Sequence, residues 1–253
     1  MKDREFGGHA CLGIAPPQSN PVVEPEFSVL LPDGVSMLVT RLVGNRGNSR
    51  QRFHQYIDNL ETSLEAFGAA EIDAFGLAVT STAYLFGDDE DNALDRASQR
   101  FGYPIISAAR AIGRALEALN ATRIALFSPY PEWLTEASRT YWAGQGYDIV
   151  SWARVAADTA DTLNIYRLRT AGLLDSMAAL DTADADVVLL TGTGMASLPA
   201  LPALAERIGK PVLTSNLCLA WALLDELGLA GLAPPRHPGE ILLGGWVPRL
   251  GRL

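Results

Sequence analysis

The segment that most constrains the fold of this chain is Asp186 to Ser197, which reads Asp-Val-Val-Leu-Leu-Thr-Gly-Thr-Gly-Met-Ala-Ser. Its apolar part, Val187 to Leu190, is typical of a parallel strand that is covered on both faces. The interleaved glycines and threonines predict a tight turn with outward-pointing backbone N–H groups, followed by a helix. Because such a turn offers hydrogen bonds and the positive end of a helix dipole, we expect it to hold a carboxylate.

A second turn of the same kind occurs earlier in the chain. Residues 75–83, Phe-Gly-Leu-Ala-Val-Thr-Ser-Thr-Ala, again lead from an apolar strand into small hydroxyl residues. Strands of this type alternate with helical segments over the 253 residues, which indicates doubly wound parallel sheets. Two such turns that face one another would form one site.

The second half of the chain repeats the pattern of the first half. A strand at 9–15 leads into a proline-rich loop at 16–21, and a strand at 122–127 leads into the loop Ser128 to Pro131. We therefore predict an α/β protein of two pseudo-symmetric lobes, with the active site in the cleft between them. The first lobe comprises residues 1–120 plus 216–253, and the second comprises residues 121–215. Asn20 becomes a candidate ligand contact, because ligands bind at the carboxyl ends of parallel strands.

The spacing of apolar residues predicts the helices that connect these strands. The expected helices cover residues 49–69, 88–101, 108–119, 131–144, 163–180, 199–208 and 216–227. Asp88 to Glu90 is interpreted as a helix start, where carboxylates complement the helix dipole. Further strands are expected at 35–43, 104–107, 147–153 and 211–214.

Composition excludes several classes of function. A net charge of −9 without clustered lysine and arginine argues against nucleic acid as a partner. We find no apolar run of about 18 residues and no signal-peptide pattern, so we expect a cytoplasmic protein that does not contact a membrane. The few histidines and cysteines are scattered, which predicts no metal and no cofactor. These residues are His9, Cys11, His54, Cys218 and His237. The sequence leaves a monomer and a homo-oligomer open.

Several short motifs follow one another in a characteristic order. They are Pro16 to Asn20 with Glu24, Val79 to Ser81, Ser128 to Tyr130, Leu190 to Gly194, Thr214 to Asn216 with Trp221, and Gly251 to Leu253. Their order and spacing resemble the maleate isomerase and arylmalonate decarboxylase branch of the aspartate/glutamate racemase superfamily. The resemblance implies two α/β lobes, a cofactor-free site in the cleft, and a small mono- or dicarboxylate as substrate.

The resemblance also implies which residues form the site. In the decarboxylase branch the two turns and a tyrosine donate hydrogen bonds to one carboxylate. The matching donors in this chain are Thr80, Ser81, Tyr130, Thr193 and Gly194. Tyr130 and Thr80 are accordingly expected to act in catalysis, and Asn20 is expected to join the donors in binding substrate.

The chain departs from the family pattern at two positions. Family members carry a catalytic cysteine before the Thr-Ser of the first turn, at the second position of the later turn, or at both. This chain has Val79 and Gly192 there, and neither side chain can transfer a proton. Cys218, Tyr84, Tyr130 and a bound water stay open as the acid.

Three interpretations of the function follow. The preferred one is a cofactor-independent lyase or isomerase, similar to a decarboxylase, that works through bound carboxylate and an enolate-like intermediate. The second is a hydratase or hydrolase that uses the same pocket. The third is a carboxylate-binding protein without catalytic activity.

Overall fold

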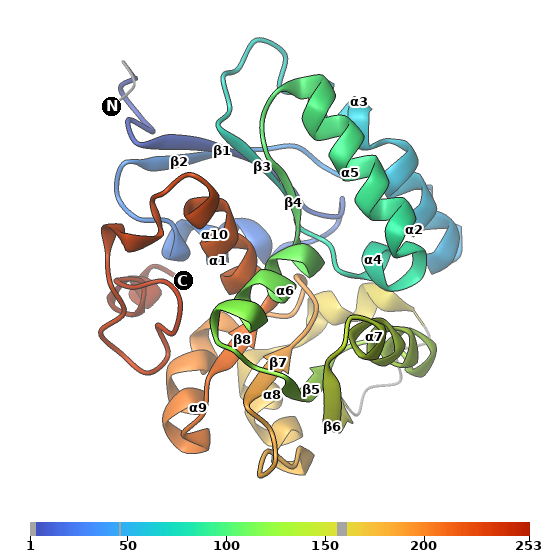
Figure 1. Ribbon diagram of the computed structural model, residues 1–253, viewed down its shortest axis with the longest axis vertical. Coiled ribbons are helices and arrows are strands. Elements are labelled where there is room, and N and C mark those ends of the chain that lie inside the picture. Colours follow the sequence, from blue (N-terminus) through green and yellow to red (C-terminus); the bar gives the residue numbers. More distant parts are fainter. Residues whose placement is uncertain (1–3, 46, 156–160) are drawn as a thin grey trace.

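Two four-stranded parallel sheets form the framework, in a computed structural model that describes residues 4–45, 47–155 and 161–253 (Figure 1). The first sheet has the order β2-β1-β3-β4, from strands Val35–Val39, Ala10–Ala15, Ala74–Leu77 and Ile105–Ser107. The second has the order β6-β5-β7-β8, from strands Asp148–Arg154, Arg123–Ser128, Val187–Leu190 and Val212–Thr214. Both sheets follow the same order, which confirms the prediction of an α/β fold built from two doubly wound parallel sheets.

Strand order explains where a ligand would bind. In the first sheet β1 pairs with β2 on one side and with β3 on the other, and in the second sheet β5 pairs with β6 and β7 in the same way. The chain therefore leaves β1 and β3, or β5 and β7, in opposite directions, and a crevice opens at their carboxyl ends. Apart from the first residue of β5, all residues of these four strands are buried.

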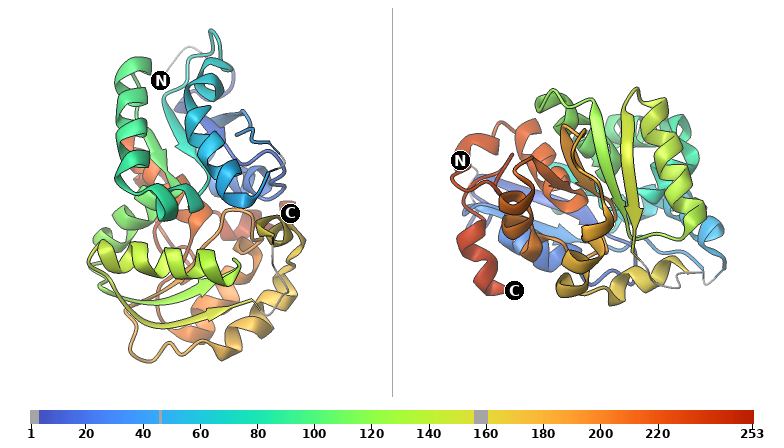
Figure 2. Two further views of the ribbon diagram at one scale, coloured as in Figure 1. Left: turned by 90° about the vertical axis from the view of Figure 1, so that its right-hand side faces the viewer. Right: turned by 90° about the horizontal axis from the view of Figure 1, so that it is seen from below.

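Helices cover both faces of each sheet (Figure 2). They are α1 Val23–Leu30, α2 Ser49–Asp58, α3 Leu60–Glu65, α4 Ser81–Phe86, α5 Asp88–Phe101, α6 Ala108–Ala118, α7 Glu132–Gly144, α8 Thr170–Ser176, α9 Leu201–Ile208 and α10 Ser215–Glu226. Among the described residues no helix is both long and apolar enough to cross a membrane. In the left view of Figure 2 the first sheet and its helices lie above the second.

The last part of the chain returns to elements of the first half. Helix α10 packs against α6 and α1, and Arg114 of α6 forms ion pairs with Asp225 and Glu226 at 3.1 and 2.7 Å. In the tail, Arg249 Nε donates to the carbonyl of Val29 at 2.7 Å. These contacts support the proposed division into lobes, whose limits at residues 120 and 215 remain a prediction.

Two of the expected helices are wrong in extent. The helix expected at 49–69 is interrupted at Asn59, a poor helix former whose side chain donates to the carbonyl of Val43 at 3.2 Å. The helix expected at 163–180 is instead a 3₁₀ helix, Thr162–Arg167, followed by α8 and a second short 3₁₀ helix. At its start the Asp161 carboxylate accepts from the Leu163 N–H at 3.1 Å, and a local bond of this kind favours a tight turn over α-helix.

Two features of the first half go beyond the predictions. Helix α1 is not among the predicted helices, and its Pro25 lies in the first turn, where the missing N–H has no helical acceptor. Glu90 belongs to the predicted helix start, and its side chain is fully buried. Its neighbours Asp88 and Asp89 do begin α5.

Candidate active site at the carboxyl ends of the strands

Three loops meet where the central strands end. The Thr193 hydroxyl, in the turn after β7, donates to the carbonyl of Ala78, which follows β3, at 2.8 Å. Asn20, in the loop after β1, donates from Nδ2 to Thr193 Oγ1 at 3.3 Å. Asn20 is itself fixed, because its Oδ1 accepts from the Val22 N–H at 2.9 Å. The structure thus brings together two turns that lie 115 residues apart in the sequence.

The loop after β5 adds a tyrosine to this group. The hydroxyls of Tyr130 and Thr80 lie 2.8 Å apart and share a hydrogen bond, and both side chains are buried. Burial raises the pKa of Tyr130 to about 12, although the hydrogen bond with Thr80 partly offsets the shift. At neutral pH Tyr130 therefore carries a neutral phenol that can donate a proton or a hydrogen bond.

The turn after β7 offers backbone donors. Within the described part of the chain, the N–H groups of Gly192, Thr193 and Gly194 form no hydrogen bond. Gly192 has a φ of +94°, a conformation that other residues rarely adopt. The expected helix does not follow directly, since helical structure starts only at Leu198. The donors therefore come from the turn itself, and the prediction of a helix dipole at this site is wrong.

A buried carboxylate holds this turn from behind. Glu26 accepts from the N–H groups of Ser197 and Leu198, both at 2.9 Å, and from Asn216 Nδ2 at 2.7 Å. Asn216 Nδ2 also donates to the carbonyl of Thr193 at 3.0 Å. Burial raises the pKa of Glu26 to about 7, while these donors lower it. Glu26 and Asn216 thus position the turn without lining the pocket.

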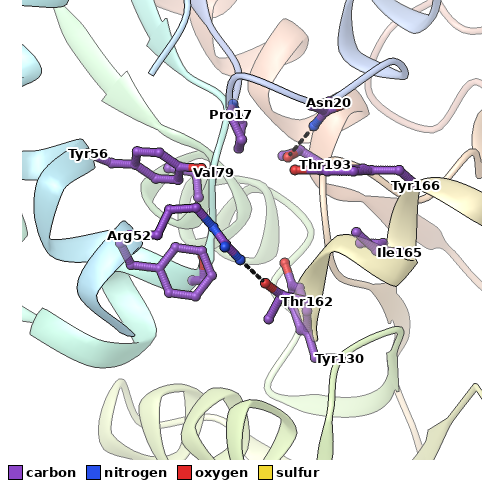
Figure 3. A pocket seen from close by; sticks show the side chains of 13 residues that line it. Pro17, Asn20, Arg52, Tyr56, Val79, Tyr130, Thr162, Ile165, Tyr166 and Thr193 are labelled. Carbon is purple, nitrogen blue, oxygen red and sulfur yellow. Dashed lines mark hydrogen bonds between the residues drawn. The ribbon is translucent and has the colours of Figure 1, made fainter. Parts of the chain in front are cut away.

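A narrow pocket opens where these groups meet (Figure 3). It is lined by Pro17, Asn20, Arg52, Phe53, Tyr56, Val79, Ser81, Tyr130, Thr162, Ile165, Tyr166, Thr193 and Gly194. Its free volume is about 30 Å³, whereas about 10–15 Å³ of such volume is enough to hold one water molecule. Part of the reason is Tyr166, since a Cβ built on Gly194 would lie 2.4 Å from its ring. The pocket therefore suits a small ligand, and the Tyr166 ring forms its wall beside Gly194.

Sequence reasoning missed Arg52 and the segment that faces it. Arg52 is 5% exposed and donates from Nη2 to Thr162 Oγ1 at 2.7 Å. A signal was present in the sequence, because Arg52 precedes Tyr56 and Leu60 at intervals of four residues and so lies on the apolar face of its helix. Tyr166 gave no such signal, since the helix expected there is 3₁₀ in the structure.

The structure places the predicted site residues at different depths. Asn20, Val79, Ser81, Tyr130, Thr193 and Gly194 line the pocket. Thr80 reaches it through Tyr130, and a Cβ on Gly192 would lie 3.2 Å from the Tyr130 hydroxyl.

The two remaining candidates, Tyr84 and Cys218, do not line the pocket. Tyr84 packs against Tyr141 and Trp142, with ring centroids 5.4 and 6.1 Å away. Cys218 lies fully buried in α10, and burial raises the pKa of its thiol.

The lining is electrically one-sided. Among the described residues that line it, Arg52 is the one charged side chain, and none is an aspartate or glutamate. The net charge of the chain is −9 and repels anions at long range, but the arginine in the lining attracts them locally. The pocket therefore favours a bound anion over a cation. No group of three or more histidine, cysteine, aspartate or glutamate side chains in the described residues could hold a metal ion.

Comparisons with known proteins agree with this geometry. Maleate isomerase of Pseudomonas putida is 27% identical to this chain over 250 residues, covering 93% of this chain and 98% of the relative. Arylmalonate decarboxylase of Bordetella bronchiseptica is 28% identical over 179 residues, covering 70% and 71%. The crystal structure of the maleate isomerase Iso from Pseudomonas putida S16 superposes with a TM-score of 0.81 at 23% identity, covering 94% of this chain and 99% of that one.

The match to the family as a whole is equally extensive. A sequence model of arylmalonate decarboxylase matches residues 12–237, which include all four loops at the pocket. The chain therefore belongs to the arylmalonate decarboxylase family.

Proposed function

We propose that this chain is an enzyme, a cofactor-independent lyase or isomerase that acts on a small carboxylic acid. The observation that supports it most is the convergence of donors on one pocket. Tyr130, which shares a hydrogen bond with Thr80, lines a pocket with Thr193 and Gly194, and no carboxylate is among its described lining residues. The N–H groups of Gly192, Thr193 and Gly194 are without a partner in the described part of the chain. The relatives reported above are enzymes named for maleate and arylmalonate, which are small carboxylates.

The donors define what this pocket does to a carboxylate. Backbone N–H groups and the Tyr130 phenol bind it at one place, while Val79 and Ile165 give the pocket apolar walls. Removal of an α-proton or loss of CO2 next to the bound carboxylate produces an enolate-like intermediate with extra charge on its oxygens. Because fixed donors bind this charge more strongly than they bind the starting acid, they lower the barrier.

We infer that Tyr130 supplies the proton in place of the family's thiols. Val79 and Gly192 occupy the positions where related enzymes carry cysteines, and neither can transfer a proton. The Tyr130 hydroxyl stands 3.2 Å from the place of a Gly192 side chain, so it faces the substrate where a thiol would. Its raised pKa suits a group that donates to a strongly basic enolate and recovers the proton from solvent.

A second candidate is a carboxylate-binding protein without catalysis. The ionisable groups that line the pocket are Arg52, Tyr56, Tyr130 and Tyr166. Burial raises the pKa of each of the three tyrosines, to about 12 for Tyr56 and Tyr130. No general base with a pKa near neutrality lines the described pocket, which is the observation that favours pure binding.

One screen distinguishes these functions. Malonates, maleate, 2-hydroxy acids and unsaturated diacids are incubated with the protein in D2O, and CO2 release, water addition and deuterium uptake are followed. CO2 release indicates a decarboxylase, deuterium uptake or cis–trans conversion an isomerase, and water addition a hydratase. Binding without any reaction across the panel supports the second candidate.

The same screen tests Tyr130 with a matched control. Tyr130→Phe should abolish deuterium uptake or CO2 release and weaken binding by about 5- to 150-fold, because a donor to a buried anion is lost. Tyr147→Phe removes a half-buried phenol that lies outside the lining and donates to the carbonyl of Gly113, and it should leave both unchanged. Equal activity in both variants would exclude Tyr130 as the proton donor.

A further inference from the structure

The pocket contains a second polar pair besides the donors around Thr193. Arg52 extends from α2 toward Thr162, and in Figure 3 this pair lies apart from the Asn20–Thr193 pair. Arg52 uses one nitrogen, Nη2, for its bonds to Thr162 Oγ1, Ser49 Oγ and Asp161 Oδ1, at 2.7, 3.3 and 3.4 Å. The donors on Nε and Nη1 are outside these three bonds, and Tyr56 lies close enough to Arg52 for the guanidinium to lower its pKa against the effect of burial.

The charge of Arg52 is only weakly compensated within the described residues. Its one ion-pair partner among these residues is Asp161, 3.4 Å away, whose side chain is 54% exposed while that of Arg52 is 6% exposed. Water screens an exposed carboxylate, so the pair contributes little. A buried guanidinium with spare donors at the wall of a pocket is a favourable partner for a desolvated anion.

We propose that Arg52 is a specificity-determining residue that binds a second anionic group of the substrate. This inference rests on the proposed function, in which the donors around Thr193 and Tyr130 hold the first carboxylate. A group bound by Arg52 is stabilised in its charged form, whereas a carboxylate that leaves as CO2 has to lose its charge. Arg52 thus favours acids with two charged groups and opposes decarboxylation of the group that it holds.

The test compares two ligands of nearly equal shape that differ by one charge. Malonate and malonamate are titrated by calorimetry against the wild-type protein and Arg52→Gln, at a pH where malonate is doubly ionised. We expect the wild-type protein to prefer malonate by about 10- to 100-fold, as charge-assisted hydrogen bonds predict. In Arg52→Gln this preference should disappear, while the affinity for malonamate stays within about threefold.

Two further variants separate binding from a structural role. Arg50→Gln makes the same charge change on the same helix, but Arg50 is exposed and stacks on Trp133 at 5.0 Å, so the malonate preference should persist. Arg52→Lys keeps the charge but loses the planar donor pair, and should retain part of the preference. It also provides the measurement if Arg52→Gln does not fold.

The outcomes are distinct. If malonamate binds but malonate is not preferred, or if Arg52→Gln retains the preference, Arg52 has no such role and the proposed function stands. If both ligands weaken equally in Arg52→Gln and Arg52→Lys, Arg52 only supports the structure. If neither ligand binds to the wild-type protein, the proposed function itself is wrong.

Discussion

The turns after β3 and β7 look alike in sequence, but the structure holds them in different ways. The first turn passes directly into α4, so Thr80 and Ser81 stand at the start of a helix. The second has no helix until Leu198, and its backbone takes a positive φ at Gly192. Hydrogen bonds from Thr193 and Asn216 tie this turn to distant parts of the chain.

Each turn has a buried glutamate behind it, and the two glutamates differ in the hydrogen bonds that they accept. Glu26, behind the second turn, accepts three hydrogen bonds. Glu90 lies beside Thr82 of α4 and beside Ser107, whose hydroxyls lower its pKa, but within the described residues neither of its oxygens accepts a hydrogen bond of ordinary geometry. The first turn is thus stable through its own helix, whereas the second depends on Glu26. Four predictions test this contrast.

The largest effect is expected from removing the two carboxyl groups. Glu26→Leu leaves the N–H groups of Ser197 and Leu198 unpaired in the interior and removes one of the two acceptors of Asn216 Nδ2. We expect it to lower the free energy of unfolding by about 3 kcal/mol or more, and Glu90→Leu by less than about 1 kcal/mol. Urea unfolding measures both, and similar losses in the two variants would show that the second turn does not depend on Glu26.

The second prediction concerns pH. Burial raises the pKa of both Glu26 and Glu90 from 4.5 to about 7. The folded protein therefore binds these protons more tightly than the unfolded chain, and the resulting stability is complete below pH 4.5 and lost as the pH rises to about 7. We expect a fall in unfolding free energy of up to about 3 kcal/mol for each carboxyl group.

The difference in unfolding free energy between wild type and Glu90→Leu isolates the part of this pH dependence that comes from Glu90. Urea unfolding at several pH values should show wild type losing stability relative to the variant as the pH rises. A difference that is constant across the window would contradict the raised pKa of Glu90.

The third prediction compares a thiol in each turn. Gly192→Cys forces a side chain onto a positive φ, and its Cβ would lie 2.8 Å from both Ile165 and Pro129. It should lower the free energy of unfolding by about 1–3 kcal/mol. Val79→Cys replaces one small side chain in the pocket by another and should change the free energy of unfolding by less than about 1.5 kcal/mol. Equal losses would mean that the second turn adapts as easily as the first.

The Val79→Cys protein also probes the anion site by its reactivity. Iodoacetate should alkylate this thiol faster than iodoacetamide does, relative to a free thiol, because the donors attract the carboxylate. Malonate should protect it. Wild type is the control, since both of its cysteines are buried. If iodoacetate and iodoacetamide alkylate this thiol at equal rates relative to a free thiol, the pocket has no anion site.

The smallest effect is expected at the native cysteines. Cys11 lies in β1 and Cys218 in α10, both outside the pocket lining. Cys11→Ala and Cys218→Ala should each keep ligand affinity and turnover within about twofold of wild type. A folded Cys218→Ala protein without activity would identify Cys218 as a relocated catalytic thiol.

Local sequence determined the strands, the turns and the fold class. An apolar run such as Val187 to Leu190 has to be buried on both faces, and Gly-Thr repeats after it have to turn. These properties depend only on neighbouring residues, so the alternation of strands and helices, and with it the two sheets, could be predicted. The pairing of Thr80 with Tyr130 was anticipated only through resemblance to a family.

Tertiary structure alone decided which buried charges surround the site. Arg52 meets Thr162 across 110 residues, and Glu26 meets Ser197 across 171. Periodicity indicates which face of a helix is buried but not what it is buried against. A charge on a buried face becomes stable only when packing supplies its partners, and those partners come from elements far away in the sequence.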